Sequence, residues 1–80
     1  MTTSQTIEQR VITVIATVFK KEEKDLSGET FLVKDLQAKS MNMIELQAVL
    51  ESEFEVELPL YRIMRAKTVS DLIVIVNETI

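Results

Sequence analysis

Hydrophobic residues recur at helical spacing in three stretches of the chain, over residues 6–20, 40–54 and 69–79. The first stretch gives the clearest pattern, because its apolar residues fall at i, i+4, i+7, i+8 and i+11: Ile7, Val11, Val14, Ile15 and Val18. The last stretch has a similar stripe between Val69 and Ile80. Each stretch therefore predicts an amphipathic helix with one face in a common core.

Polar residues at the ends of these stretches support the helix boundaries. Thr6 with Gln9, and Thr68 with Asp71, have the spacing of a capping box, in which a side chain accepts a hydrogen bond from a free helical N–H. Pro59 suits the first turn of a further helix. We therefore predict an all-α fold, a small four-helix bundle with a short third helix, over residues 6–20, 40–54, 60–65 and 69–79.

Two short segments also have the pattern of β-strands. Residues 53–58, EFEVEL, alternate between polar and apolar, and residues 72–76, LIVIV, form a continuous apolar run. An α+β binding module is therefore the structural alternative. We favour the helical bundle, because the first segment continues directly from a helix and the second falls within the last helical stripe.

A long loop is predicted between the first two helices. Residues 25–39 contain the only glycine of the chain and no helical stripe. Loops of this length are uncommon in compact domains and are often functional. We expect four apolar side chains to attach the loop to the core: Phe31, Leu32, Val33 and Leu36.

The helix predicted over residues 40–54 has two apolar faces. One face carries the expected core residues Met43, Leu46, Leu50 and Phe54. The opposite face carries Met41, Ile44 and Ala48. Scattered apolar residues are common on protein surfaces, whereas a second apolar stripe on one helix often marks a site for a partner. The pattern alone leaves both interpretations open.

Composition limits the chemistry that the chain can perform. The 80 residues are expected to form one domain spanning residues 1–80, and 46% of them are hydrophobic. The chain has no cysteine and no histidine, which excludes disulfides, metal sites built on thiolate or imidazole, and Ser-His or Cys-His nucleophile pairs. We find no glycine-rich phosphate-binding motif and no marked carboxylate pair, so we expect no metal site and no catalytic residues. The chain is not expected to be an enzyme.

The charge distribution bears on the partners. A net charge of −4 argues against binding to nucleic acid, which needs a basic face. The apolar runs are too short to span a membrane, and the start MTTSQTIEQ lacks the features of a signal peptide, so we expect a cytoplasmic protein. Residues 40–59 carry five glutamates and no basic residue, whereas residues 60–67 carry Arg62, Arg65 and Lys67 and no acid. This contrast fits either an ordinary solvated surface or an electrostatic docking surface.

Ser40 stands at the junction between the long loop and the second helix. Its hydroxyl could act as an N-cap, which is a common role for serine at this position. Alternatively, the hydroxyl could carry a phosphate ester, because the free N–H groups and the positive end of a helix dipole favour a phosphate.

The residues around Ser40 resemble a known family. The segment from Leu32 to Met41, LVKDLQAKSM, is similar to the attachment motif of acyl carrier proteins, which typically has an acidic residue and leucine before Gly-Ala/Val-Asp-Ser-Leu. The resemblance continues through four shorter segments: Glu45-Leu46, Leu50 to Phe54, Leu58-Pro59 and Thr68 to Leu72. It covers nearly the whole chain, including its length, its acidity and the four-helix pattern.

This resemblance implies a specific function. Acyl carrier proteins carry 4′-phosphopantetheine on the serine of the motif, here Ser40, and hold acyl groups as thioesters on its thiol. The implied partners are a phosphopantetheinyl transferase and acyl-transferring or condensing enzymes of fatty-acid, lipid or polyketide biosynthesis, with the carrier itself a monomer. In this family the outer face of the second helix docks partner enzymes, and the positions of this sequence that match it are Met41, Ile44, Glu45, Ala48 and Glu51.

Several positions differ from the motif. Gln37 and Lys39 replace the usual glycine and aspartate, and Arg62 and Arg65 put positive charge in a third helix that is often acidic. These differences favour a specialised carrier with dedicated partners. They also leave an alternative, a carrier-like helical interaction domain in which Ser40 is unmodified.

Overall fold

The computed structural model describes residues 6–80, which form four α-helices and one short 3-10 helix. The elements are α1 (Ile7–Phe19), η1 (Glu23–Asp25), α2 (Ser40–Phe54), α3 (Leu60–Arg65) and α4 (Val69–Thr79). The predicted all-α fold is confirmed; the bounds of the last three helices agree, and α1 is one residue shorter at each end. Residues 1–5, on which most of the expectation about a signal peptide depends, lie outside the described residues.

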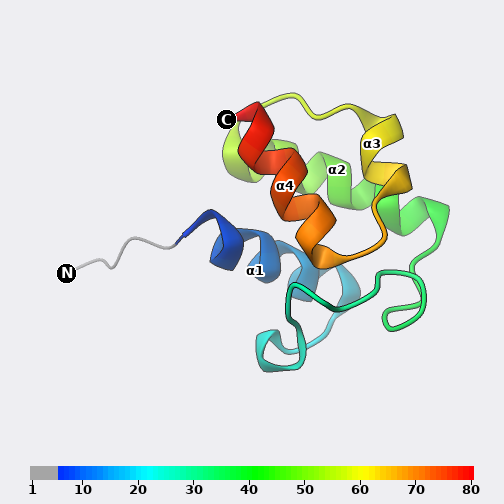
Figure 1. Cartoon of the computed structure of the whole chain (residues 1–80). Coiled ribbons are helices and arrows are strands. Elements are labelled where there is room, and N and C mark those ends of the chain that lie inside the picture. Colours follow the sequence, from blue (N-terminus) through cyan, green and yellow to red (C-terminus); the bar gives the residue numbers. More distant parts are fainter. Residues whose placement is uncertain (1–5) are drawn as a thin grey trace.

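The three longer helices pack around one core, and α3 closes one side of it (Figure 1). Helix α1 contacts both α2 and α4, while α3 contacts α2 and α4. The long loop leads from the end of α1 to the start of α2 (Figure 1). No helix within residues 6–80 combines the length and the apolar character that crossing a bilayer requires.

The strand alternative is wrong for both segments. Residues 72–76 lie within α4, which buries Leu72, Ile75 and Val76 at helical spacing. In the other segment, α2 ends at Phe54 and Glu55 turns the chain with a left-handed backbone. No β-strand occurs in the part of the chain that the structure describes, and its one isolated antiparallel bridge joins Phe31 to Thr68.

The core is apolar and contains residues from every α-helix and from the long loop. Its fully buried members are Val11, Ile15, Leu32, Leu46, Leu50, Ile63, Val69, Leu72 and Val76. Leu46 and Leu50 confirm the predicted core face of α2. The prediction that Phe54 is a core residue is wrong, because this side chain is only half-buried at the edge of the core. Its ring lies beneath the guanidinium of Arg10, 4.4 Å from the ring centroid.

The long loop is fastened to the junction between α3 and α4. The Leu32 N–H donates to the Lys67 carbonyl at 2.9 Å, and the Val69 N–H donates to the Thr30 carbonyl at 3.0 Å. Leu32 is buried and Leu36 half-buried, as expected. The expectation is wrong for Phe31 and Val33, which remain exposed.

Both threonines cap their helices as predicted, but only the second capping box is complete, because the Gln9 side chain donates to Glu23 instead. The Gln9 N–H donates to Thr6 Oγ1 at 3.0 Å, and the Asp71 N–H donates to Thr68 Oγ1 at 3.2 Å. The Asp71 carboxylate in turn accepts the Thr68 N–H at 3.1 Å, which completes a reciprocal capping box.

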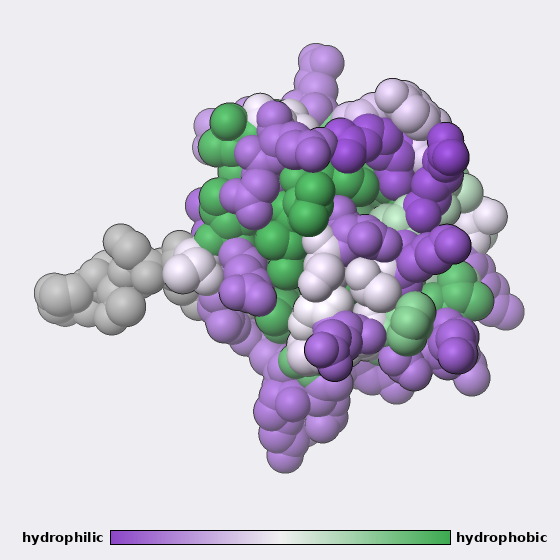
Figure 2. Space-filling view, in the orientation of Figure 1, coloured by the Kyte–Doolittle hydropathy of each residue, from purple (hydrophilic) through white to green (hydrophobic). Residues whose placement is uncertain are grey.

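Surface hydrophobicity is uneven on the face that carries α4. Apolar side chains gather over this helix and are bordered by hydrophilic residues (Figure 2). The exposed large apolar residues of the C-terminal segment are Val74 and Ile80.

Candidate functional site

Ser40 is the first residue of α2, and its side chain is exposed. The N-cap is Lys39, whose backbone is extended and whose carbonyl accepts the Met43 N–H at 3.1 Å. The interpretation of Ser40 as an N-cap is therefore wrong by one residue. The side chain that serves the helix start is Asn42, whose Oδ1 accepts the Lys39 N–H at 2.8 Å.

The electrostatic surroundings of Ser40 suit a phosphate ester. Helix N-termini present free N–H groups and the positive end of the helix dipole, and both favour an anion. Helix α2 has no acidic residue in its first turn, and the cationic Lys39 directly precedes Ser40. A phosphate on the Ser40 hydroxyl would therefore meet no carboxylate from the first turn of its own helix.

The loop before Ser40 has a defined hydrogen-bonded shape. The Gln37 N–H donates to the Val33 carbonyl and the Ala38 N–H donates to the Leu32 carbonyl, both at 2.9 Å. Gln37 itself has a left-handed backbone, with φ of 57°. Glycine adopts this conformation without steric cost, which explains why the motif usually has glycine here. Gln37 nevertheless maintains the turn that leads to Ser40.

The two predicted faces of α2 are both present. Met43, Leu46 and Leu50 are buried, whereas Met41 is 80% exposed and Ile44 is 48% exposed. Glu45 and Ala48 are also exposed. The structure therefore brings together four of the five predicted docking residues on one exposed face that starts beside Ser40.

Glu51, the fifth predicted docking residue, has a structural contact that the sequence did not indicate. It is half-buried, and its Oε2 accepts the Leu58 N–H at 2.8 Å. The Gln47 side chain donates to the Leu58 carbonyl, also at 2.8 Å. Two α2 side chains thus hold both backbone polar groups of Leu58, in the loop before α3. A sequence pattern could not have identified Gln47, because its partner is a backbone atom of a distant residue.

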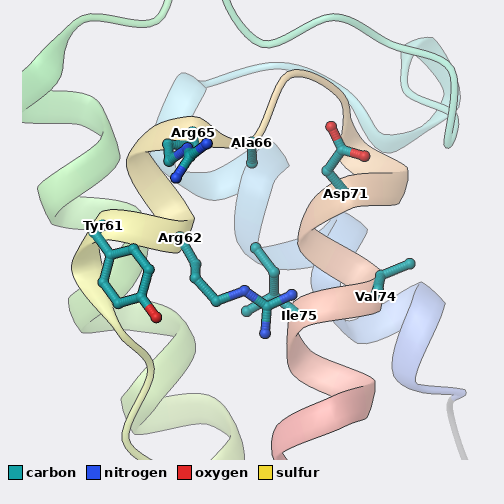
Figure 3. Close-up of a pocket in the computed structure, with 7 residues that line it drawn as sticks. All are labelled: Tyr61, Arg62, Arg65, Ala66, Asp71, Val74 and Ile75. Atoms are coloured by element: carbon teal, nitrogen blue, oxygen red, sulfur yellow. The ribbon is translucent and has the colours of Figure 1, made fainter.

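The acidic stretch of residues 40–59 and the basic stretch of residues 60–67 each have a charged residue that forms an ion pair within the molecule. Arg10 Nε forms an ion pair with Glu53 Oε2 at 2.9 Å, and Arg62 pairs with Glu78 at 2.7 Å. The Arg62 side chain extends from α3 toward α4 in a hollow that Tyr61 and Asp71 also line (Figure 3). One acid of the acidic stretch and one base of the basic stretch are therefore paired with residues outside these stretches.

Comparisons with known proteins agree with this geometry. The family described as "Phosphopantetheine attachment site" matches residues 9–74, which include the loop and the helix start that carry Ser40. The acyl carrier proteins of Rickettsia canadensis (strain McKiel) and of Rickettsia typhi (strain ATCC VR-144 / Wilmington) are each 32% identical to this chain over 78 residues. The aligned region covers 98% of this chain and 91% of each relative. The chain therefore belongs to the acyl carrier protein family, whose domain is the attachment site for phosphopantetheine.

Proposed function

We propose that this protein carries acyl intermediates as thioesters on a 4′-phosphopantetheine arm attached to Ser40. It presents them to partner enzymes of fatty-acid, lipid or polyketide biosynthesis. The observation that carries the proposal is the position of Ser40, an exposed hydroxyl at the start of α2 inside the family match. The arm supplies the thiol that this cysteine-free chain lacks.

The residues of the chain then have positioning roles. The start of α2 and Lys39 favour the phosphate that joins the arm to Ser40. The hydrogen-bonded turn from Leu32 to Ala38 fixes where this attachment point lies relative to the core. The chain contributes no group to the chemistry of the acyl unit, which the partner enzymes transform.

We further propose that partners dock on the outer face of α2, through Met41, Ile44, Glu45 and Ala48. A partner that uses the arm must approach Ser40, and these side chains lie next to it on the same helix. Met41 and Ile44 would supply apolar contact, and Glu45 would steer basic partners. Glu51 would act at the edge of this face as a positioning residue, because its carboxylate holds the loop before α3. We also propose, by analogy with the family, that the protein acts as a cytoplasmic monomer.

Intact-protein mass spectrometry tests the attachment. The purified protein is incubated with coenzyme A and a phosphopantetheinyl transferase, and we expect one arm on the wild type and none on Ser40→Ala. Ser52→Ala is the matched control, because Ser52 is also an exposed serine of α2 and should leave modification unchanged. Modification of Ser40→Ala at another residue would overturn the assignment to Ser40.

The alternative function is an interaction domain with an unmodified Ser40. The substitutions at Gln37 and Lys39 are the sequence features that favour it. The left-handed backbone of Gln37 weighs against it, because the turn before Ser40 forms without glycine. A wild-type protein that gains no mass with several phosphopantetheinyl transferases, and carries no arm when isolated from its native host, would establish the alternative.

A further inference from the structure

A second exposed feature lies away from the outer face of α2. Residues of the long loop and of the end of α3 form the two walls of a groove of about 530 Å³. The loop contributes Phe31, Val33 and Lys34, and the other wall consists of residues 64–67. None of the proposed docking residues of α2 is among those that line it.

The two walls of this loop–α3 groove are held together by the backbone. The Leu32 N–H donates to the Lys67 carbonyl at 2.9 Å, and Phe31 forms an antiparallel bridge with Thr68. Leu32 itself is fully buried in the core. The groove is therefore formed before any ligand arrives, which reduces the ordering cost of binding.

The groove exposes apolar side chains that the core does not use. Phe31 is 40% exposed, Val33 is 65% exposed and Met64 is 41% exposed. The Lys34 ammonium lies 5.1 Å from the centroid of the Phe31 ring, so a cation covers one side of the aromatic group. A single apolar side chain of a ligand would have these three residues as its surroundings.

The charge of the groove is opposite to that of the whole protein. Lys34, Arg65 and Lys67 line it, and none of the three forms an ion pair with any residue between positions 6 and 80. The neighbouring acids are directed to the backbone instead. Asp35 accepts the Phe31 N–H and Asp71 accepts the Lys67 N–H, each at 2.8 Å. The basic side chains are thus available to a ligand, although the chain as a whole has a net charge of −4.

We propose that this groove docks an acidic segment of a partner protein. An apolar side chain of the segment lies between Phe31, Val33 and Met64, and flanking carboxylates pair with the basic residues of the walls. An anionic membrane is the less suitable occupant, because a flat bilayer surface does not fill a hollow between two walls, whereas one side chain of a peptide can.

The test uses the unmodified protein, so its outcome does not depend on an arm at Ser40. The probe is a synthetic peptide with a leucine-phenylalanine pair between two glutamates on each side, titrated into ¹⁵N-labelled protein. The same peptide with lysines in place of the glutamates is the control ligand. Three variants remove features of the groove, Lys34→Glu, Lys67→Glu and Val33→Ser, and Lys24→Glu makes the same charge change on η1 outside the groove.

We expect the acidic peptide to shift the amide signals of residues 31–34 and 64–67 and to bind more weakly at higher salt. Each groove variant should weaken binding on the order of five- to tenfold, whereas Lys24→Glu should leave the affinity unchanged. An unchanged pattern of signals elsewhere would show that the variants are folded. The proposal is overturned if the peptide causes no shifts at millimolar concentration, if the lysine peptide binds equally well, or if the shifts map to the outer face of α2. If the protein does not bind the peptide but binds phosphatidylglycerol vesicles, and Lys34→Glu and Lys67→Glu weaken this vesicle binding, the proposal is overturned in favour of a membrane.

Discussion

The two ends of α2 differ in how far their side chains are engaged within the protein. At its start, Ser40 and Met41 are exposed. At its end, Arg10 binds both the carboxylate and the carbonyl of Glu53 and covers the ring of Phe54. One end of the helix is thus open to another molecule while the other end is fixed to α1. A carrier needs both properties, because the attachment point must be accessible and must also keep its position.

Replacement of a residue on the core face of α2 should have the largest effect. Leu50 is fully buried, so Leu50→Ala should lower the free energy of unfolding by about 3–5 kcal/mol. Ile44→Ala removes a side chain from the exposed face and should leave the melting temperature nearly unchanged while slowing transfer of the arm to Ser40. Thermal unfolding and the transferase rate separate these effects. Equal destabilisation by the two substitutions would show that the outer face is also part of the core.

The fixed end of α2 should be the next most sensitive. Because Phe54 is half-buried beneath Arg10, we expect Phe54→Ala to cost about 2–3 kcal/mol, less than a fully buried phenylalanine would. Arg10→Ala should cost about 1 kcal/mol by removing the partner of Glu53 and the cover of the ring. Urea unfolding of both variants and of the double variant measures the coupling. Strictly additive losses would contradict the contact between the two residues.

Helical periodicity was sufficient to predict the fold but not the contacts between side chains and backbone. The stripes of Leu46 and Leu50 identified the core face of α2, because burial follows the 3.6-residue period. The residues that the sequence misplaced are those whose surroundings come from another part of the chain. The pattern places Phe54 in the core, yet Arg10, on another helix, covers its ring. The resemblance places Glu51 on the docking face, yet its carboxylate accepts a backbone N–H of the next loop.

The candidate site shows the same division between local and distant information. The exposure of Ser40 and its position at the start of α2 were predictable from the end of the loop and the beginning of the stripe. The exception is the N-cap, which depends on local contacts and is nevertheless misassigned by one residue, because Asn42 rather than Ser40 accepts the Lys39 N–H at the helix start. The groove beside Phe31 could not be predicted, since its walls come from segments separated by 30 residues and joined by backbone hydrogen bonds.

Glu51 and Glu45 provide a smaller, matched test along α2. Glu51→Ala leaves the Leu58 N–H without its partner and should cost about 1–2 kcal/mol. Glu45→Ala changes the same charge on the exposed face and should alter stability by less than about 0.5 kcal/mol. Hydrogen exchange of the Leu58 amide provides the specific measurement, because only the first variant should accelerate it. Equal exchange rates in the two variants would contradict the contact seen for Glu51.

The smallest expected effect on stability concerns Ser40 itself. Ser40 is the first residue inside the helix and not its N-cap, so Ser40→Ala should change the free energy of unfolding by less than about 0.5 kcal/mol. Thr68 is the matched control, because its hydroxyl does cap α4, and Thr68→Ala should cost about 1 kcal/mol. Urea unfolding of the two unmodified variants measures the difference directly. A loss for Ser40→Ala as large as that for Thr68→Ala would mean that the hydroxyl is engaged in holding the helix start. A free hydroxyl at this position is what an attachment site requires, since the atom that receives the arm then gives up no structural bond.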